Sequence, residues 1–131
     1  MTLQFFRFAL VGSGGFAVDL LVLQLALLVV GLDAYTGRGF SYLCAATSTW
    51  MMNRNFTFAA ERTDVLWREW VRFLISNVAG GAANLGVYAA LVASRLPLVS
   101  MPWLALAAGS VVGLFFNFFA SRKFVFTARP R

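Results

Sequence analysis

The chain has 131 residues, a net charge of +6 and no histidine; 60% of its residues are hydrophobic and only 12% are charged. A soluble globular domain has roughly 25% charged residues, so this composition excludes an ordinary soluble domain and favours one integral membrane domain over 1–131. The cations flank apolar runs, so their expected partners are membrane lipids and not nucleic acid. With a single cysteine, Cys44, and no histidine, an internal disulfide, a metal site and a Ser-His-Asp triad are not expected.

Four apolar runs are each close to the roughly 20 residues that an α-helix needs to cross a bilayer. They cover residues 8–30, 39–56, 71–93 and 102–120. The runs are continuous and not alternating, and a backbone in lipid must satisfy its own hydrogen bonds, so helices are favoured over strands. The sequence therefore predicts an all-α membrane protein with four transmembrane helices.

The connectors between these runs have the composition of loops. Residues 31–38 contain two glycines, residues 59–72 are the most charged stretch, and residues 95–101 contain Pro97. Pro102 suits the first turn of a helix. Trp67 and Trp70 are three residues apart, which predicts a short helix over 63–70 that lies at the membrane interface and continues into the third span.

The positive charges predict the orientation of the chain. If the termini and the 59–72 connector share one side, only Arg38 and Arg95 of the eleven cations lie on the other side. Positively charged residues accumulate on the cytoplasmic side of membrane proteins. We therefore expect both termini in the cytoplasm.

The second half of the sequence repeats the first. The offset is 65 residues at the start of each half and 68 residues at its end. The matching pairs are Arg7 and Arg72, Phe8 and Phe73, Gly15 and Gly80, Asp19 and Asn84, Asn53 and Ser121, Arg54 and Arg122, Phe56 and Phe124, and Phe58 and Phe126. Each half, about 5–58 and 70–126, contains two spans, so the repeat is expected to be parallel, with its pseudo-twofold axis along the membrane normal.

Small and polar residues share faces of the predicted helices. The faces are Gly12, Gly15, Asp19 and Leu23; Tyr42, Ala45, Thr49 and Asn53; Asn77, Gly80, Asn84 and Tyr88; and Ser110, Gly113, Asn117 and Ser121. Close helix packing explains the glycines, and Gly109 with Gly113 forms a small-xxx-small pair.

Asp19 is harder to explain by packing alone, because a carboxylate at mid-membrane costs about 2.5–3.5 kcal/mol on insertion scales. It is a functional candidate, and the alternative is a protonated side chain bonded to Asn84 or to a backbone carbonyl. The equivalence of Asp19 and Asn84 favours a polar centre shared by the two halves.

Each half ends with a small polar residue, a cation and an aromatic-x-Phe sequence, at residues 53–58 and 121–126. The cations are either membrane anchors or ligands for a phosphate, which suits the planar fork of arginine. The candidate substrate-binding residues are Asp19, Asn53, Arg54, Asn84, Asn117, Ser121, Arg122 and Lys123. No cofactor and no catalytic residue are expected.

These features together resemble the GtrA-like family of small four-helix membrane proteins. The resemblance rests on Arg7-Phe8 with Gly12, on Asp19 in the first span, on the 53–58 closure, and on the second-half counterparts from Arg72 to Phe126. Phe56 and Phe124 stand where the family often has tryptophan, and Asn77 replaces a second copy of Gly12.

The resemblance implies a role in cell-surface polysaccharide synthesis at the cytoplasmic membrane. The implied function is translocation of a polyprenyl-monophosphate-linked sugar, with Arg54, Arg122 and Lys123 on the phosphate and Asp19, Asn84 and Asn117 on the sugar. Four short helices enclose little volume, so a homo-oligomer is expected. Two alternatives remain open: a non-transporting anchor or subunit of a glycosyltransferase, which would dock on 59–72, and a small multidrug-type exporter, which the strong cation bias disfavours. The chain is not expected to be an enzyme, because no nucleophile–base pair is visible.

Overall fold

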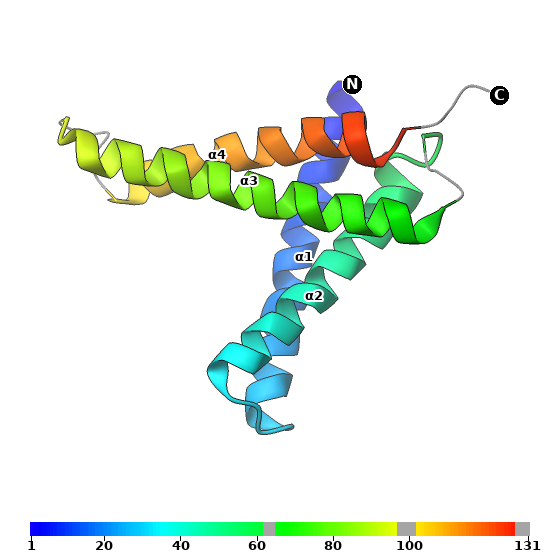
Figure 1. The fold of residues 1–131 in the computed structure, drawn as a ribbon, viewed down its shortest axis with the longest axis horizontal. Helices are drawn as coiled ribbons and strands as arrows, with labels where there is room; N and C mark the ends of the chain where they lie inside the picture. The colour runs from blue at the N-terminus through cyan, green and yellow to red at the C-terminus, as the bar shows by residue number, and fades with distance from the viewer. Residues whose placement is uncertain (62–64, 97–101, 128–131) are drawn as a thin grey trace. The chain divides into compact units, whose positions relative to one another are not determined.

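The computed structural model describes residues 1–61, 65–96 and 102–127, without the side chains of residues 102 and 103. The chain forms two compact units, each an antiparallel helical hairpin that ends in a π-helical turn (Figure 1). The first unit contains α1 (Thr2–Leu28), α2 (Ala34–Met52) and η1 (Asn53–Thr57). The second contains α3 (Leu66–Ser94), α4 (Pro102–Ala120) and η2 (Ser121–Val125).

All regular secondary structure in the described residues is helical, which confirms the all-α part of the predicted fold class. Three stretches there are long and apolar enough to span a membrane, namely Thr2–Leu28, Leu66–Ser94 and Leu104–Val125. The α2 helix is less apolar because hydroxyl side chains, glycines and Arg38 interrupt it. The fourth predicted span therefore stays a prediction.

The helix bounds differ from the predicted ones mainly at the starts. The α4 helix covers the predicted 102–120, whereas α1 begins at Thr2 and α2 begins at Ala34. The early start of α2 places Arg38 inside the helix, so its assignment to a connector was wrong. The carboxylate of Asp33 caps α2 by accepting hydrogen bonds from the backbone N–H groups of Tyr35 (3.0 Å) and Thr36 (3.1 Å), and an Asp at this position satisfies the otherwise unpaired N–H groups of a first turn.

The predicted interfacial helix is the beginning of α3. Residues 63 and 64 lie outside the described part of the chain, and α3 runs without a break from Leu66 to Ser94. The rings of Trp67 and Trp70 lie 5.1 Å apart, as expected for neighbours on one helical face. Glu69, between them, is fully buried.

In the first hairpin, α1 packs on α2 through a face centred on Gly15. A Cβ at Gly15 would collide with Cγ2 of Thr49, so this glycine permits a close approach of the helices. Gly15 and Thr49 belong to the predicted faces. By contrast, a Cβ at Gly12 would have no neighbour within 4 Å, so this member of the predicted face does not explain the packing.

In the second hairpin, Gly80 of α3 and two glycines of α4 have the same role. A Cβ at Gly80 would collide with the side chain of Asn117, and one at Gly113 would lie 3.1 Å from the carbonyl oxygen of Gly80. A Cβ at Gly109 would lie 2.6 Å from the carbonyl oxygen of Asn84. The small-xxx-small pair thus lets the two backbones approach, as in other membrane helix pairs.

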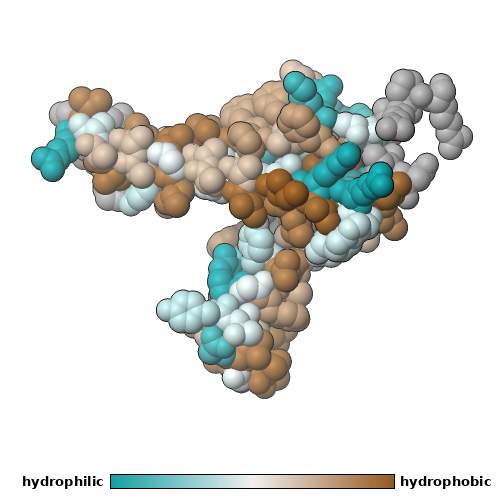
Figure 2. All heavy atoms as spheres, viewed as in Figure 1, coloured by the Kyte–Doolittle hydropathy of each residue, from teal (hydrophilic) through white to brown (hydrophobic). Residues whose placement is uncertain are grey.

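Large apolar side chains cover much of the outer surface of these helices (Figure 2). Phe16, Leu28, Ile75 and Leu85 are each more than 60% exposed. In water this surface would be a strong association site, whereas in lipid it is ordinary.

Candidate functional site

The two closing sequences form π-helical turns instead of simple helix ends. In η1 the N–H of Phe58 donates to the carbonyl oxygen of Asn53 at 2.8 Å, and in η2 the N–H of Phe126 donates to that of Ser121 at 2.9 Å. Both bonds join residues five apart, which is the spacing of a π-helix. Such turns are rare in proteins, and many of those that occur lie at functional sites. The sequence offered no signal for this geometry.

A buried aromatic pair fixes each π-turn against the first helix of its hairpin. The rings of Phe8 and Phe58 lie 6.2 Å apart at 67°, and those of Phe73 and Phe126 lie 6.4 Å apart at 61°. Both pairs have an edge-to-face geometry, which aromatic side chains favour. All four rings are at most 5% exposed.

An arginine closes each turn from the same first helix. Nη1 of Arg7 donates to the carbonyl oxygen of Phe56 at 3.2 Å, and Nη1 of Arg72 donates to that of Phe124 at 3.4 Å. These bonds satisfy carbonyl groups at a helix C-terminus. The function of Arg7 and Arg72 as partners of the π-turns was not predicted; the matching positions in the two halves were the available signal.

The predicted phosphate-binding cations lie on these π-turns. Arg54 in η1 is partly exposed, and Arg122 and Lys123 in η2 are exposed. Nζ of Lys123 lies 5.8 Å from the centre of the Phe124 ring, within reach of a cation–π interaction. Each hairpin therefore presents cationic side chains at the end where its second helix terminates.

The small polar residues next to these cations are buried. Asn53 is 2% exposed, and its Oδ1 accepts a hydrogen bond from the hydroxyl of Thr57 at 2.8 Å. Ser121, its counterpart, is fully buried, and position 125 carries a valine in place of the threonine. Asn53 thus supports the turn from inside, which is a different position from that of an exposed ligand.

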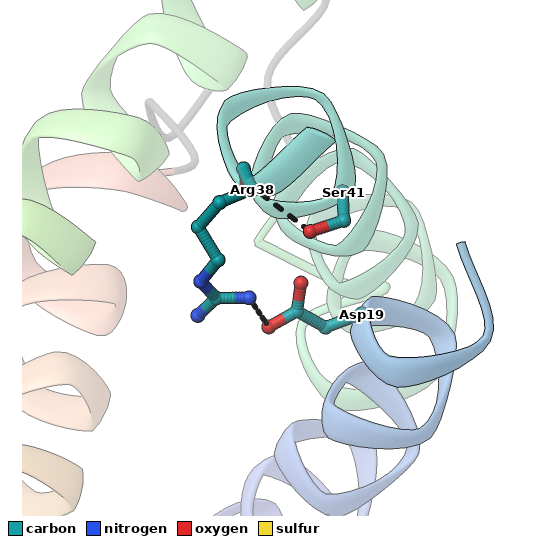
Figure 3. A network of polar contacts seen from close by, with 3 residues as sticks. All are labelled: Asp19, Arg38 and Ser41. Atoms are coloured by element: carbon teal, nitrogen blue, oxygen red, sulfur yellow. Dashed lines mark hydrogen bonds and ion pairs between the residues drawn. The ribbon is translucent and has the colours of Figure 1, made fainter. Parts of the chain in front are cut away.

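Asp19 lies in the first hairpin and pairs with Arg38 of α2 (Figure 3). Nη1 of Arg38 donates to Oδ2 of Asp19, and the hydroxyl of Ser41 lies beside the pair and donates to the backbone carbonyl of Arg38 at 3.1 Å. The sequence reasoning looked for the partner of Asp19 in the other half and missed Arg38. Asp19 is nine residues before the end of α1, whereas Arg38 is four residues after the start of α2. The two positions are therefore not level in the antiparallel hairpin, and the long arginine side chain reaches across the difference.

Asn84 and Asn117 lie where α3 and α4 pack together. Asn84 faces Gly109 and Gly113, and Asn117 lies against Gly80.

The eight predicted site residues are therefore divided between the hairpins. Asp19, Asn53 and Arg54 belong to the first, and Asn84, Asn117, Ser121, Arg122 and Lys123 belong to the second. A polar centre shared by both hairpins stays a prediction.

Three buried side-chain atoms lack a hydrogen-bond partner among the described residues. They are Oδ1 of Asp19, Oδ1 of Asn117 and Oγ of Ser121. An unsatisfied buried polar atom typically costs about 1–3 kcal/mol, so such atoms are uncommon without a reason. All three belong to predicted site residues, and all three can accept a hydrogen bond from a hydroxyl group.

An open apolar groove of about 750 Å³ runs along the first hairpin. Its lining begins next to Asp19 and ends next to the η1 turn. The lining residues are Val18, Phe40, Leu43, Cys44, Thr47, Ser48, Met51 and Met52.

Comparison with known proteins identifies the family. No curated protein matches the chain. Residues 7–126, nearly the whole chain, match the family described as GtrA/DPMS, transmembrane domain. The matched region begins at Arg7 and ends at Phe126, and it includes both π-turns and their arginine partners. The chain is therefore a multi-pass membrane protein of the GtrA/DPMS family, and this membership implies involvement in polysaccharide or glycolipid synthesis.

Proposed function

We propose that the protein translocates a polyprenyl-monophosphate-linked sugar from the cytoplasmic to the outer leaflet of the cytoplasmic membrane. The observation that carries this proposal is the pair of π-turns, which place Arg54 in η1, and Arg122 and Lys123 in η2, next to a buried small polar residue. Family membership supports a glycolipid substrate. The protein acts by binding and passage, without catalysing a reaction on the sugar.

In this proposal all four long helices cross the membrane, with both termini in the cytoplasm. The α2 helix is 19 residues long and packs antiparallel to α1, so it returns the chain across the bilayer although it is less apolar. Within the hairpin Ser41 is buried and Thr49 is partly buried, and this shielding from lipid offsets part of the cost of insertion.

The chain acts as two parallel copies of one unit. Equivalent contacts occur in both hairpins at the sequence offsets of 65 and 68: an aromatic pair, an arginine–carbonyl bond, a π-turn and a glycine contact. The substrate phosphate binds to Arg54, Arg122 and Lys123 on the cytoplasmic side. Arginine offers paired N–H groups that match two phosphate oxygens.

The remaining parts of the substrate have chemically matched surfaces. Sugar hydroxyl groups donate to the unpartnered oxygens of Asp19 in the first hairpin and Asn117 in the second. Asn84 lies at the same α3–α4 contact as Asn117. The apolar groove on the first hairpin accepts part of the polyprenyl chain, since it connects the level of Asp19 with that of the η1 turn. A homo-oligomer would enclose the headgroup more fully than one copy.

The phosphate role is tested by translocation assays on purified protein in liposomes. We expect Arg54→Ala combined with Arg122→Ala to reduce the rate of lipid-linked sugar translocation at least tenfold, because charge-assisted hydrogen bonds contribute about 1.5–3 kcal/mol each. The matched control is Arg95→Gly, which removes an exposed cation where the backbone φ is +53°, a conformation that glycine adopts readily.

An unchanged rate in the Arg54/Arg122 double variant would contradict the phosphate role. The glycosyltransferase-subunit alternative makes a different prediction: the protein would co-purify with an enzyme whose activity it supports, and it would not accelerate translocation by itself. Proton-coupled efflux of an aromatic cation that depends on Asp19 would instead support the exporter alternative.

A further inference from the structure

The ion pair between Asp19 and Arg38 is present in the first hairpin alone. At the equivalent positions of the second hairpin the sequence has Asn84 and Leu106. That hairpin packs closely through Asn84 and Gly109 without any charge at either position. An ion pair is therefore not needed to hold a hairpin of this design together, and its presence in one half requires another explanation.

Ionised side chains are costly inside a membrane span, so the presence of both Asp19 and Arg38 needs a reason. Such side chains are usually found where they serve function. An ion pair is weak evidence for stability, because an exposed member gains little attraction and the desolvation of a buried member offsets it. The chain retains both charges nonetheless.

Arg38 is well placed for a second ligand. One guanidinium nitrogen, Nη1, bonds to Asp19, while the Arg38 side chain is 56% exposed. The Asp19 side chain is 15% exposed, and its Oδ1 is buried without a partner among the described residues. The two residues thus offer exposed cationic N–H donors beside an unused acceptor oxygen (Figure 3). A sugar phosphate has the complementary groups, an anionic oxygen and a hydroxyl donor.

Arg38 lies far from the π-turn cation of its own hairpin. Sixteen residues separate it from Arg54, which corresponds to roughly 24 Å along a helix. One phosphate therefore cannot contact both arginines at once. Arg38 is near the start of α2, at the end of the hairpin opposite η1.

We propose that Arg38 is a second phosphate-binding station, at the outer side of the membrane, and that Asp19 competes with the phosphate for it. The phosphate of the substrate displaces the Asp19 carboxylate from Arg38, and Oδ1 of Asp19 accepts a hydrogen bond from the sugar. Return of Asp19 to Arg38 weakens the phosphate contact and favours release. This inference rests on the proposed translocation function for its substrate, but binding can be measured without translocation.

The experiment measures binding of citronellyl phosphate, a short water-soluble prenyl monophosphate, to purified protein in uncharged detergent by calorimetry. Measurements in the Arg54→Ala/Arg122→Ala/Lys123→Ala background isolate the outer station from the three proposed phosphate ligands of the π-turns. The test variants are Arg38→Leu and Asp19→Asn, which introduce the residue types that the second hairpin has at these positions.

We expect Arg38→Leu to weaken binding about tenfold or more, because it removes the charged donors. Asp19→Asn should strengthen binding roughly two- to tenfold, because it removes the competing charge and retains an acceptor oxygen. In the Arg38→Leu background, Asp19→Asn should no longer change the binding affinity. Thermal unfolding checks that each variant is folded; Arg38→Lys, which keeps the charge but loses the planar fork, should bind with intermediate affinity.

The proposal would be overturned if Asp19→Asn weakened binding, or if Arg38→Leu left binding unchanged in folded protein. The ion pair would then have a structural role only. Phosphatidylglycerol that competes as well as citronellyl phosphate would also overturn it, since Arg38 would then be a general lipid anchor. Binding as expected without translocation by the wild type would retain the station and refute the transport function. Translocation without this binding would do the reverse.

Discussion

Gly109 and Gly113 of α4 allow its backbone to contact Asn84 of α3. We expect Gly109→Ala to destabilise the second hairpin by about 1–3 kcal/mol, because the new Cβ would lie 2.6 Å from the carbonyl oxygen of Asn84, which cannot rotate away. Thermal unfolding in detergent measures the effect.

The matched control is Gly86→Ala on α3, where an added Cβ meets nothing within 4 Å. This change should be neutral or stabilising by up to about 1 kcal/mol, since alanine has the higher helix propensity. Equal effects of the two substitutions would show that the helices are not in close contact at Gly109.

The sequence predicted the glycine contacts but not the partner of Asp19. Gly15, Gly80 and Gly113 were predicted to face other helices from their spacing, and they do. The partner of Asp19 was missed because equivalence between the halves directed attention to Asn84. A side chain as long as arginine spans more than a helical turn, so position along the sequence constrains its partner weakly.

Asp33 caps the N-terminus of α2. Hydrogen bonds from the side chain and backbone of Thr36, and from the backbone of Tyr35, hold the pKa of the Asp33 carboxyl below its usual value. Because the unfolded chain then has the higher pKa, the carboxylate stabilises the fold above the unfolded value of about 3.9, and this contribution is lost as the pH falls through the folded pKa.

We therefore expect Asp33→Asn to flatten the acid side of the stability curve. Asparagine also caps a helix but does not titrate. Melting temperatures measured from pH 6 downwards should fall less steeply for the variant than for the wild type below about pH 4. Parallel curves would show that Asp33 is not an effective cap.

The π-turns depend on their buried aromatic residues. Phe58→Ala and Phe126→Ala should each destabilise the protein by about 3–5 kcal/mol, because these rings are at most 1% exposed and pack on Phe8 and Phe73. Chemical or thermal unfolding measures the loss.

The matched controls are Phe56→Ala and Phe124→Ala, two residues earlier, where the rings are 66% and 60% exposed. These changes should cost much less. If all four substitutions had the same effect, the π-turns would not be anchored through their second aromatic residue.

At the element scale the sequence predicted helices well and their ends less well. Continuous apolar runs gave α4 with its bounds, since Pro102 marks its start. The start of α2 was placed late because Arg38 and two glycines resemble a connector, whereas the Asp33 cap begins the helix earlier. The π-turns could not be predicted, because one extra residue per turn is stabilised by packing against Phe8 and Phe73 and not by local propensity.

The proposed topology of the whole chain can be tested by cysteine labelling. In a Cys44→Ala background the sequence has no other cysteine, so single exposed cysteines report their side of the membrane. We expect Ala34→Cys, at the start of α2, to react with an impermeant maleimide from outside the cell, because both α1 and α2 are proposed to span. Thr127→Cys, after η2, should react only in opened cells.

The reverse pattern would overturn the cytoplasmic placement of the termini. Reaction of both cysteines from the same side would show that the segment between them crosses an even number of times, which the four-span arrangement does not allow for these two positions. The reverse pattern would also place the η2 cations on the outer side of the membrane, which contradicts their proposed role at the cytoplasmic leaflet.

Translocation by the purified wild-type protein tests the central claim most directly. Protein reconstituted into liposomes with a fluorescent polyprenyl monophosphate sugar should make the inner-leaflet pool accessible to an external quencher much faster than in protein-free liposomes. The rate should rise with the number of protein copies per vesicle. Equal rates with and without protein, in vesicles where unfolding measurements show a folded chain, would contradict the account.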